Sequence, residues 1–190
     1  PGDPKESARL AWIDGVVSHS NNGVIGEVFN AMLVSLSYVD NDVRSILEKT
    51  INMLPKESEY YEIVNFAYNL CLVHAGRVTI WPICEKRVER CNWIHAYPNA
   101  MAEVIALYYG NGDFDETLHI IAMLGQDVDC NAAQIMTVLG VIVGSENIDS
   151  RWKNPIGDDL DTYLRSLKKM KISELSQDTF DAINVKYKNV

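Results

Sequence analysis

Apolar residues recur every three or four positions along most of the chain, a spacing typical of amphipathic α-helices. Val43, Ile46, Leu47 and Ile51 form one such stripe. No segment alternates apolar and polar residues over any length, so the sequence predicts an all-α protein. The predicted helices are the following: one that starts at Pro4, one over about 24–39, one capped by Asp40 or Asn41, one capped by Ser58, one over about 79–91, one from about Pro98 to 109, one capped by Asp113, and one over about 131–143.

The last part of the chain has a weaker pattern. From Trp152 onward apolar residues are less regular, and lysines gather near residue 170. Ser173 is a candidate N-cap for a final helix. We therefore expect one helical domain over residues 1–165, followed over 166–190 by a helical tail or the start of a linker.

Length and composition narrow the function classes. The chain has 190 residues, of which 47% are hydrophobic, enough for one domain with a sizeable core and no disulfide staple. No apolar run is long enough to span a bilayer. A net charge of −9 argues against non-specific nucleic-acid binding, but not against an anionic ligand held by a metal ion or a helix N-terminus. We expect neither nucleic acid nor membrane as a partner.

The cysteines give an indication of the compartment. No CxxC pair and no secretory signal accompany them, so we expect free thiols in the cytoplasm rather than disulfides. The chain begins at Pro1 rather than methionine, and we expect further sequence upstream. The cysteines are Cys71, Cys84, Cys91 and Cys130.

The segment over residues 125–133, GQDVDCNAA, carries the strongest candidate chemistry. Asp127 and Asp129 stand two residues apart on a non-helical approach to a helix that is apolar nearly all round. Such a helix should be buried, which would place both carboxylates in the interior or at the floor of a cleft. Buried carboxylates need a partner or a cation, and one or two suffice for Mg²⁺. Alternatively, Asp129 caps the helix and Asp127 is a solvated turn residue.

Two other loops carry polar residues between helices. In the first, Gly23 leaves backbone N–H groups open to a phosphate at a helix N-terminus, and His19 could donate a hydrogen bond to the same ligand. The alternative is a turn with a surface histidine. In the second, His95 and Asn99 flank a proline, and we favour a structural role in which the asparagine bonds the backbone and the histidine satisfies a buried partner.

The 125–133 segment resembles the GxDTDxxAA signature of the ADP-ribosylglycohydrolase family. Further segments resemble family blocks in the same order, and together they extend over about residues 3–160. The resemblance implies an all-α, orthogonal multi-helix bundle with two Mg²⁺ ions, which binds the ribose of ADP-ribose and hydrolyses a glycosidic bond to it. These segments are SHS–GVIG at 18–26, HAYPNA at 95–100, LYYGNGDF at 107–114, and residues 140–155.

The resemblance also implies roles for individual residues. Asp127 and Asp129 match the two metal-binding aspartates of the signature, and Val128 stands where members have threonine. Cys130 falls where they place a Thr or Ser hydroxyl ligand, and a thiol suits Mg²⁺ poorly. His19 matches the histidine that contacts ADP-ribose, and Gly23 lies in the same segment.

Part of the family pattern has no counterpart in the sequence. We find neither the Thr-Asp-Asp triplet nor the acidic residue near the scissile bond. We therefore expect a C-terminal portion of the family domain, an incomplete bundle carrying half of the metal site, inactive alone, with the catalytic acidic residue upstream. Its partners would be an ADP-ribose-containing substrate and the missing N-terminal half, and exposed apolar surface would favour a homo-oligomer. The rival interpretations are a non-catalytic ADP-ribose-binding or structural member of the family, and a helical scaffold without a ligand.

Overall fold

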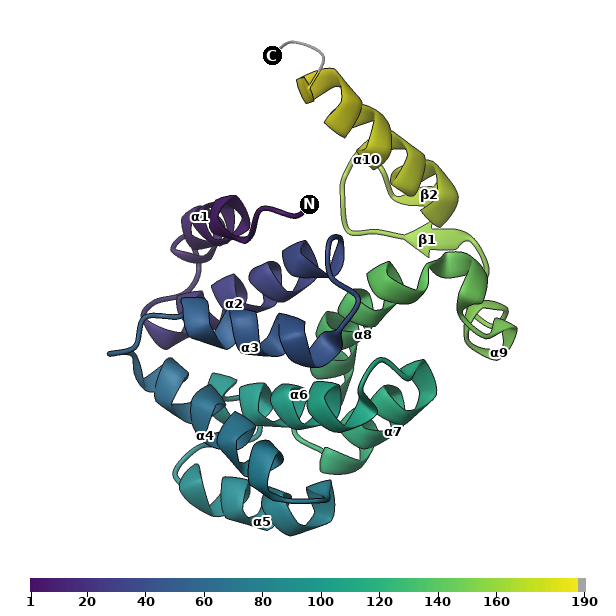
Figure 1. Ribbon diagram of the computed structural model, residues 1–190. Coiled ribbons are helices and arrows are strands. Elements are labelled where there is room, and N and C mark those ends of the chain that lie inside the picture. The colour runs from purple at the N-terminus through teal and green to yellow at the C-terminus, as the bar shows by residue number, and fades with distance from the viewer. Residues whose placement is uncertain (188–190) are drawn as a thin grey trace. The chain divides into compact units, whose positions relative to one another are not determined.

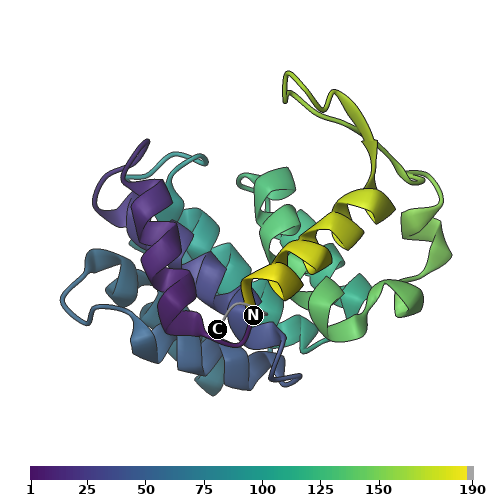
Figure 2. The same ribbon diagram turned by 90° about the horizontal axis from the view of Figure 1, so that it is seen from above.

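The computed structural model describes the backbone of residues 1–187 and the side chains of residues 1–183. It divides into two compact units, Pro1–Asn147 and a smaller unit from Ile148 onward, and each is described by itself. The first unit is shown from two sides in Figures 1 and 2. Among the described residues, no helix combines the length and the apolar character needed to cross a bilayer.

Residues 1–147 contain helices and loops only, so the predicted all-α class is confirmed. Most bounds differ from the expected ones by a few residues. The elements are α1 (Pro4–Gly15), α2 (Asn22–Ser37), α3 (Val43–Met53), α4 (Glu59–Val73), α5 (Arg77–Arg87), α6 (Ala96–Gly110), α7 (Phe114–Leu124), α8 (Val128–Val143) and the short 3₁₀ turn η1 (Ser145–Asn147).

Side-chain caps fix several helix starts where the sequence predicted them. Asp3, Ser58 and Asp113 each accept a hydrogen bond, at 2.8–3.1 Å, from the backbone N–H three residues further on. Each bond satisfies a donor that the first turn of a helix leaves free, which is worth about 1 kcal/mol. The predicted starts of α1, α4 and α7 are therefore confirmed.

The predicted cap of the third helix is wrong. Asp42, rather than Asp40 or Asn41, accepts bonds from two backbone N–H groups of α3. Asp40 instead accepts bonds from Lys49 Nζ at 2.7 Å and Ser45 Oγ at 2.8 Å. These bonds, above all the one from Lys49, lower the pKa of Asp40 to about 2. Asp40 therefore ties the loop to α3 without capping it.

Helix α6 forms the centre of the first unit. Nearly all of its residues are buried, and it packs against α4 and α7 and, less extensively, against α2, α3, α5 and α8. In Figure 1, α8 runs obliquely to the neighbouring α2, as in a multi-helix bundle with crossing axes. The C-terminal end of α6 approaches α7 so closely that a Cβ on Gly110 would lie 2.0 Å from Thr117 Oγ1.

The second unit contains a hairpin that the sequence analysis did not predict. It comprises α9 (Ser150–Lys153), strands β1 (Asp159–Asp161) and β2 (Lys169–Lys171), and α10 (Ile172–Tyr187). The antiparallel strands place aspartates opposite lysines, with Asp159 facing Lys171. Helix α10 follows β2 directly, as Figure 2 shows. Ser173 lies inside this helix, so its predicted role as the N-cap is wrong; its Oγ donates to Asp158 instead.

Candidate metal centre

The candidate aspartates lie at the first turn of α8. The helix begins at Val128, three residues earlier than predicted, so Asp129 belongs to the helix rather than to a non-helical approach. Asp127 occupies the N-cap position, but its side chain makes no capping hydrogen bond. The alternative in which Asp129 is the cap is therefore wrong, and both carboxylates remain available for another role.

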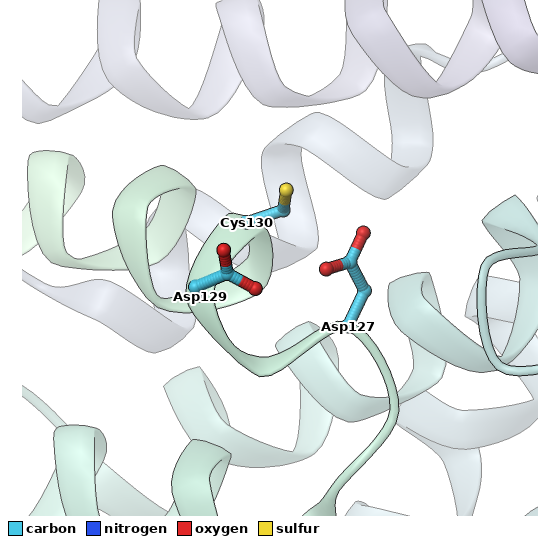
Figure 3. Close-up of side chains that lie close together, drawn as sticks. All are labelled: Asp127, Asp129 and Cys130. Atoms are coloured by element: carbon cyan, nitrogen blue, oxygen red, sulfur yellow. The ribbon is translucent and has the colours of Figure 1, made fainter.

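Three potential ligands converge at this turn. One ligand atom from each of Asp127, Asp129 and Cys130 can be chosen so that all lie within 4.8 Å of one another. Figure 3 shows Asp127 on the loop and the other two side chains on the helix, around a common space. Two oxygens bound to one Mg²⁺ are at most about 4.2 Å apart, twice the usual Mg–O distance. Small side-chain rotations would thus bring these atoms onto one cation.

The site lies nearer the surface than expected. Asp127 is half-buried, whereas Asp129 and Cys130 are exposed, so the prediction of a buried pair of carboxylates is wrong. The cause is that α8 is amphipathic: it buries one face, and its opposite face carries polar or small residues at 129, 130, 133 and 137. The buried residues are Asn131, Ile135, Val138 and Leu139.

The amide of Asn99, on α6, fixes this turn in place. Its Oδ1 accepts hydrogen bonds from the Asp127 backbone N–H at 3.0 Å and from Asn131 Nδ2 at 2.7 Å. Its Nδ2 donates to the carbonyls of Trp93 and His95 at 2.8 and 2.9 Å. The expected bonding of Asn99 to the backbone is confirmed. Its link to the turn that carries the aspartates was not foreseen, although paired asparagines at 99 and 131 are a signal in the sequence.

The electrostatics of the three side chains are coupled. A hydrogen bond from the Cys130 thiol to the Asp127 carboxylate raises the pKa of that thiol, and the negative charge of Asp127 adds to the effect. Asp129 contributes a smaller repulsion of the thiolate in the same direction. The turn therefore concentrates negative potential, which favours a cation.

His19 lies in the loop between α1 and α2, and Gly23 lies in the first turn of α2. The exposed His19 ring pairs through Nδ1 with Ser18 Oγ at 2.8 Å. It lies against Gly23, where an added Cβ would be 3.3 Å from His19 Cδ2. The Gly23 N–H donates to the Ser20 carbonyl at 3.2 Å, so a phosphate would compete with that bond. Neither residue belongs to the cluster of ligands at α8.

His95 has the structural role that we favoured. Its Nδ1 accepts a hydrogen bond from the backbone N–H of Tyr97 at 3.2 Å, which caps α6. The Tyr97 hydroxyl in turn donates to Glu59 Oε2 at 2.7 Å and lowers the pKa of that carboxyl. The cap thus fixes the start of α6, next to the Trp93 and His95 carbonyls that accept hydrogen bonds from Asn99.

The fold and the site together define a helical protein with a group of potential cation ligands at a helix start. The family model for ADP-ribosylglycohydrolase matches residues 1–187. The chain therefore belongs to the ADP-ribosylglycohydrolase family, a family of hydrolases that use metal ions, as its motifs predicted. No curated protein and no solved structure matches the chain.

Proposed function

We propose that this chain belongs to a metal-dependent hydrolase that cleaves a glycosidic bond to ADP-ribose, with Mg²⁺ as the ion that the family resemblance implies. The observation that supports it most is the convergence of Asp127, Asp129 and Cys130 within 4.8 Å in a member of a hydrolase family. Neither carboxylate caps the helix, so local structure alone does not account for both acidic groups at this turn. The function thus rests on cation binding at the start of α8.

We propose a separate role for each of the candidate residues. Asp127 and Asp129 would hold the cation, and Asn99 would keep their turn fixed against α6. A bound cation would supply orientation of the ribose hydroxyls and polarisation of oxygen atoms. His19 and the start of α2, near Gly23, would bind the ADP-ribose, as the family resemblance implies. Two carboxylates fall short of a two-ion site, so we propose that further acidic ligands and the catalytic carboxylate lie outside this group.

The test is calorimetric titration of the purified chain with ADP-ribose in the presence of Mg²⁺. We expect weak binding that Asp127→Ala abolishes, whereas Asp14→Ala, on the exposed side of α1, leaves it unchanged. Since the Asp127 side chain makes no capping bond, its removal should not unfold α8. Identical binding by wild type and Asp127→Ala would contradict the proposed role of the site.

Turnover tests the incomplete metal site. We expect no hydrolysis of an ADP-ribosylated substrate by the 190-residue chain alone. Strong hydrolysis that Asp127→Ala abolishes would show that this chain holds every group the reaction needs, and would refute the half-site proposal.

A second candidate function is ADP-ribose binding without catalysis. It is favoured by Cys130, because a thiol replaces the hydroxyl expected at this position and is a poor ligand for Mg²⁺. The protein expressed from its complete gene distinguishes the two functions. Binding of ADP-ribose without hydrolysis would support the non-catalytic one.

A further inference from the structure

We infer that the group formed by Asp127, Asp129 and Cys130 selects a thiophilic divalent cation of the Zn²⁺ type over Mg²⁺. This inference rests on the proposed function only in requiring that these side chains bind a cation. It concerns which cation they take, and it holds whether or not the chain hydrolyses anything.

The chemistry of the donor set disagrees with Mg²⁺. Mg²⁺ is a hard cation that takes oxygen ligands in octahedral geometry, and it gains little from sulfur. Zn²⁺ accepts thiolate and carboxylate ligands together, and its affinity for mixed sites exceeds that of most other divalent first-row ions. One thiol and two carboxylates therefore fit Zn²⁺ better than Mg²⁺.

The spacing of the three side chains suits a tetrahedral site. At a tetrahedral ion, Zn–S and Zn–O distances of about 2.3 and 2.1 Å place two ligand atoms about 3.6 Å apart. The observed separations, within 4.8 Å, need only small rotations of side chains that are exposed or half-buried. Three protein ligands leave a fourth position open, the arrangement of zinc sites that accept water or substrate.

The site is also prepared for such a cation. The Cys130 thiol is hydrogen-bonded to the Asp127 carboxylate, so a sulfur and a carboxylate oxygen already face the same space. The Asn99 amide holds the Asp127 backbone at 3.0 Å, so two of the ligands start from a turn anchored to the core. An anchored turn lowers the cost of ordering the ligands.

The first experiment compares cations on the purified 190-residue chain by calorimetry. We expect wild type to bind Zn²⁺ more tightly than Mg²⁺. Cys130→Ser replaces the thiol by a hydroxyl and should weaken Zn²⁺ binding by about tenfold or more. Loss of an outer-shell partner already weakens a metal site by about that much, and here a direct ligand is lost. Mg²⁺ binding by this variant should be unchanged or stronger. Cys91→Ser, at a half-buried thiol outside the group, is the matched control and should behave as wild type.

The second experiment reports the ligand atom directly. Titration with Cd²⁺ should produce the ultraviolet charge-transfer absorption of a cadmium–thiolate bond in wild type and Cys91→Ser. Cys130→Ser and Asp127→Asn should lack it or need far more metal.

Three outcomes would overturn the inference. Equal ratios of Zn²⁺ to Mg²⁺ affinity in wild type and Cys130→Ser would show that the thiol does not set the preference, while leaving a metal site in place. Zn²⁺ binding that survives Asp127→Asn would locate the ion elsewhere. Binding of neither cation would remove the site, and the proposed function with it.

Discussion

Replacing Glu103 by glutamine should make the stability of the first unit less sensitive to a rise in pH from about 4.5 to 8. This carboxyl lies on α6 and is 2% exposed, and its Oε2 has no hydrogen-bond partner among the described residues. The titratable neighbour is Tyr60 of α4, which is also buried, and the polar neighbour is Asn30 of α2. Burial raises the pKa of Glu103 to about 8, against which the Asn30 amide acts only weakly.

The raised pKa fixes the direction of the pH dependence. Below pH 4.5, the ordinary pKa of the group, the carboxyl is protonated in both states and its full contribution to stability is present. Between pH 4.5 and about 8, the unfolded chain loses this proton while the folded chain keeps it, so stability falls as pH rises. At about 1.4 kcal/mol for each pKa unit, this loss amounts to about 5 kcal/mol at most.

The assay is urea unfolding of wild type and Glu103→Gln at pH 5 and pH 9. Because all other groups are shared, the difference between the two free energies of unfolding isolates Glu103. We expect the variant to gain several kcal/mol relative to wild type between these pH values. Glu57→Gln, at an exposed carboxyl, is the control and should show no such gain. A difference that stays constant from pH 5 to pH 9 would refute the raised pKa.

Two further predictions concern helix contacts. Asn99→Ala should lower the free energy of unfolding by about 2–4 kcal/mol, since it leaves the buried amide of Asn131 and the half-buried backbone N–H of Asp127 unpaired. It should also weaken Zn²⁺ binding in calorimetry. Gly110→Ala should lower the free energy of urea unfolding by about 3 kcal/mol or more, at the upper end for overpacking, because the added Cβ would overlap both the backbone and the side chain of Thr117. Gly140→Ala has open space around its Cβ and should be neutral or stabilising.

Local signals predicted most of the helices correctly. Caps such as Asp3 and Ser58 are read from the sequence because the bond that they make spans only three residues. The cap of α3 was misplaced because three polar residues stand together, and the carboxylate of Asp40 is bound by Lys49, nine residues further on, instead of capping the helix. The spacing of apolar residues cannot predict which of these polar side chains Lys49 binds.

The hairpin of the second unit shows a different limit. Its strands have three residues each and carry charges on most positions, so no apolar alternation marks them. The pairing instead places Asp159 opposite Lys171 and Asp161 opposite Lys169. Opposite charges become a strand signal only once the register is known.

The candidate ligands were found from the sequence, but their surroundings were not. Asp127, Asp129 and Cys130 lie close together along the chain, so one helical turn suffices to bring them together. Their exposure depends on which face of α8 packs against the bundle. The anchoring by Asn99 joins positions 28 residues apart, and it required the crossing of α6 and α8 to be known.

That crossing has a consequence for the order in which the molecule assembles. The turn that carries Asp127 is bonded to the most buried helix of the first unit, rather than to a surface loop. Opening of this turn must break the bond to Asn99, so the Asp127 amide should exchange its hydrogen with solvent more slowly than an amide of an exposed loop. The ligands would then take their places when α6 and α8 dock, and not in a later, separate step.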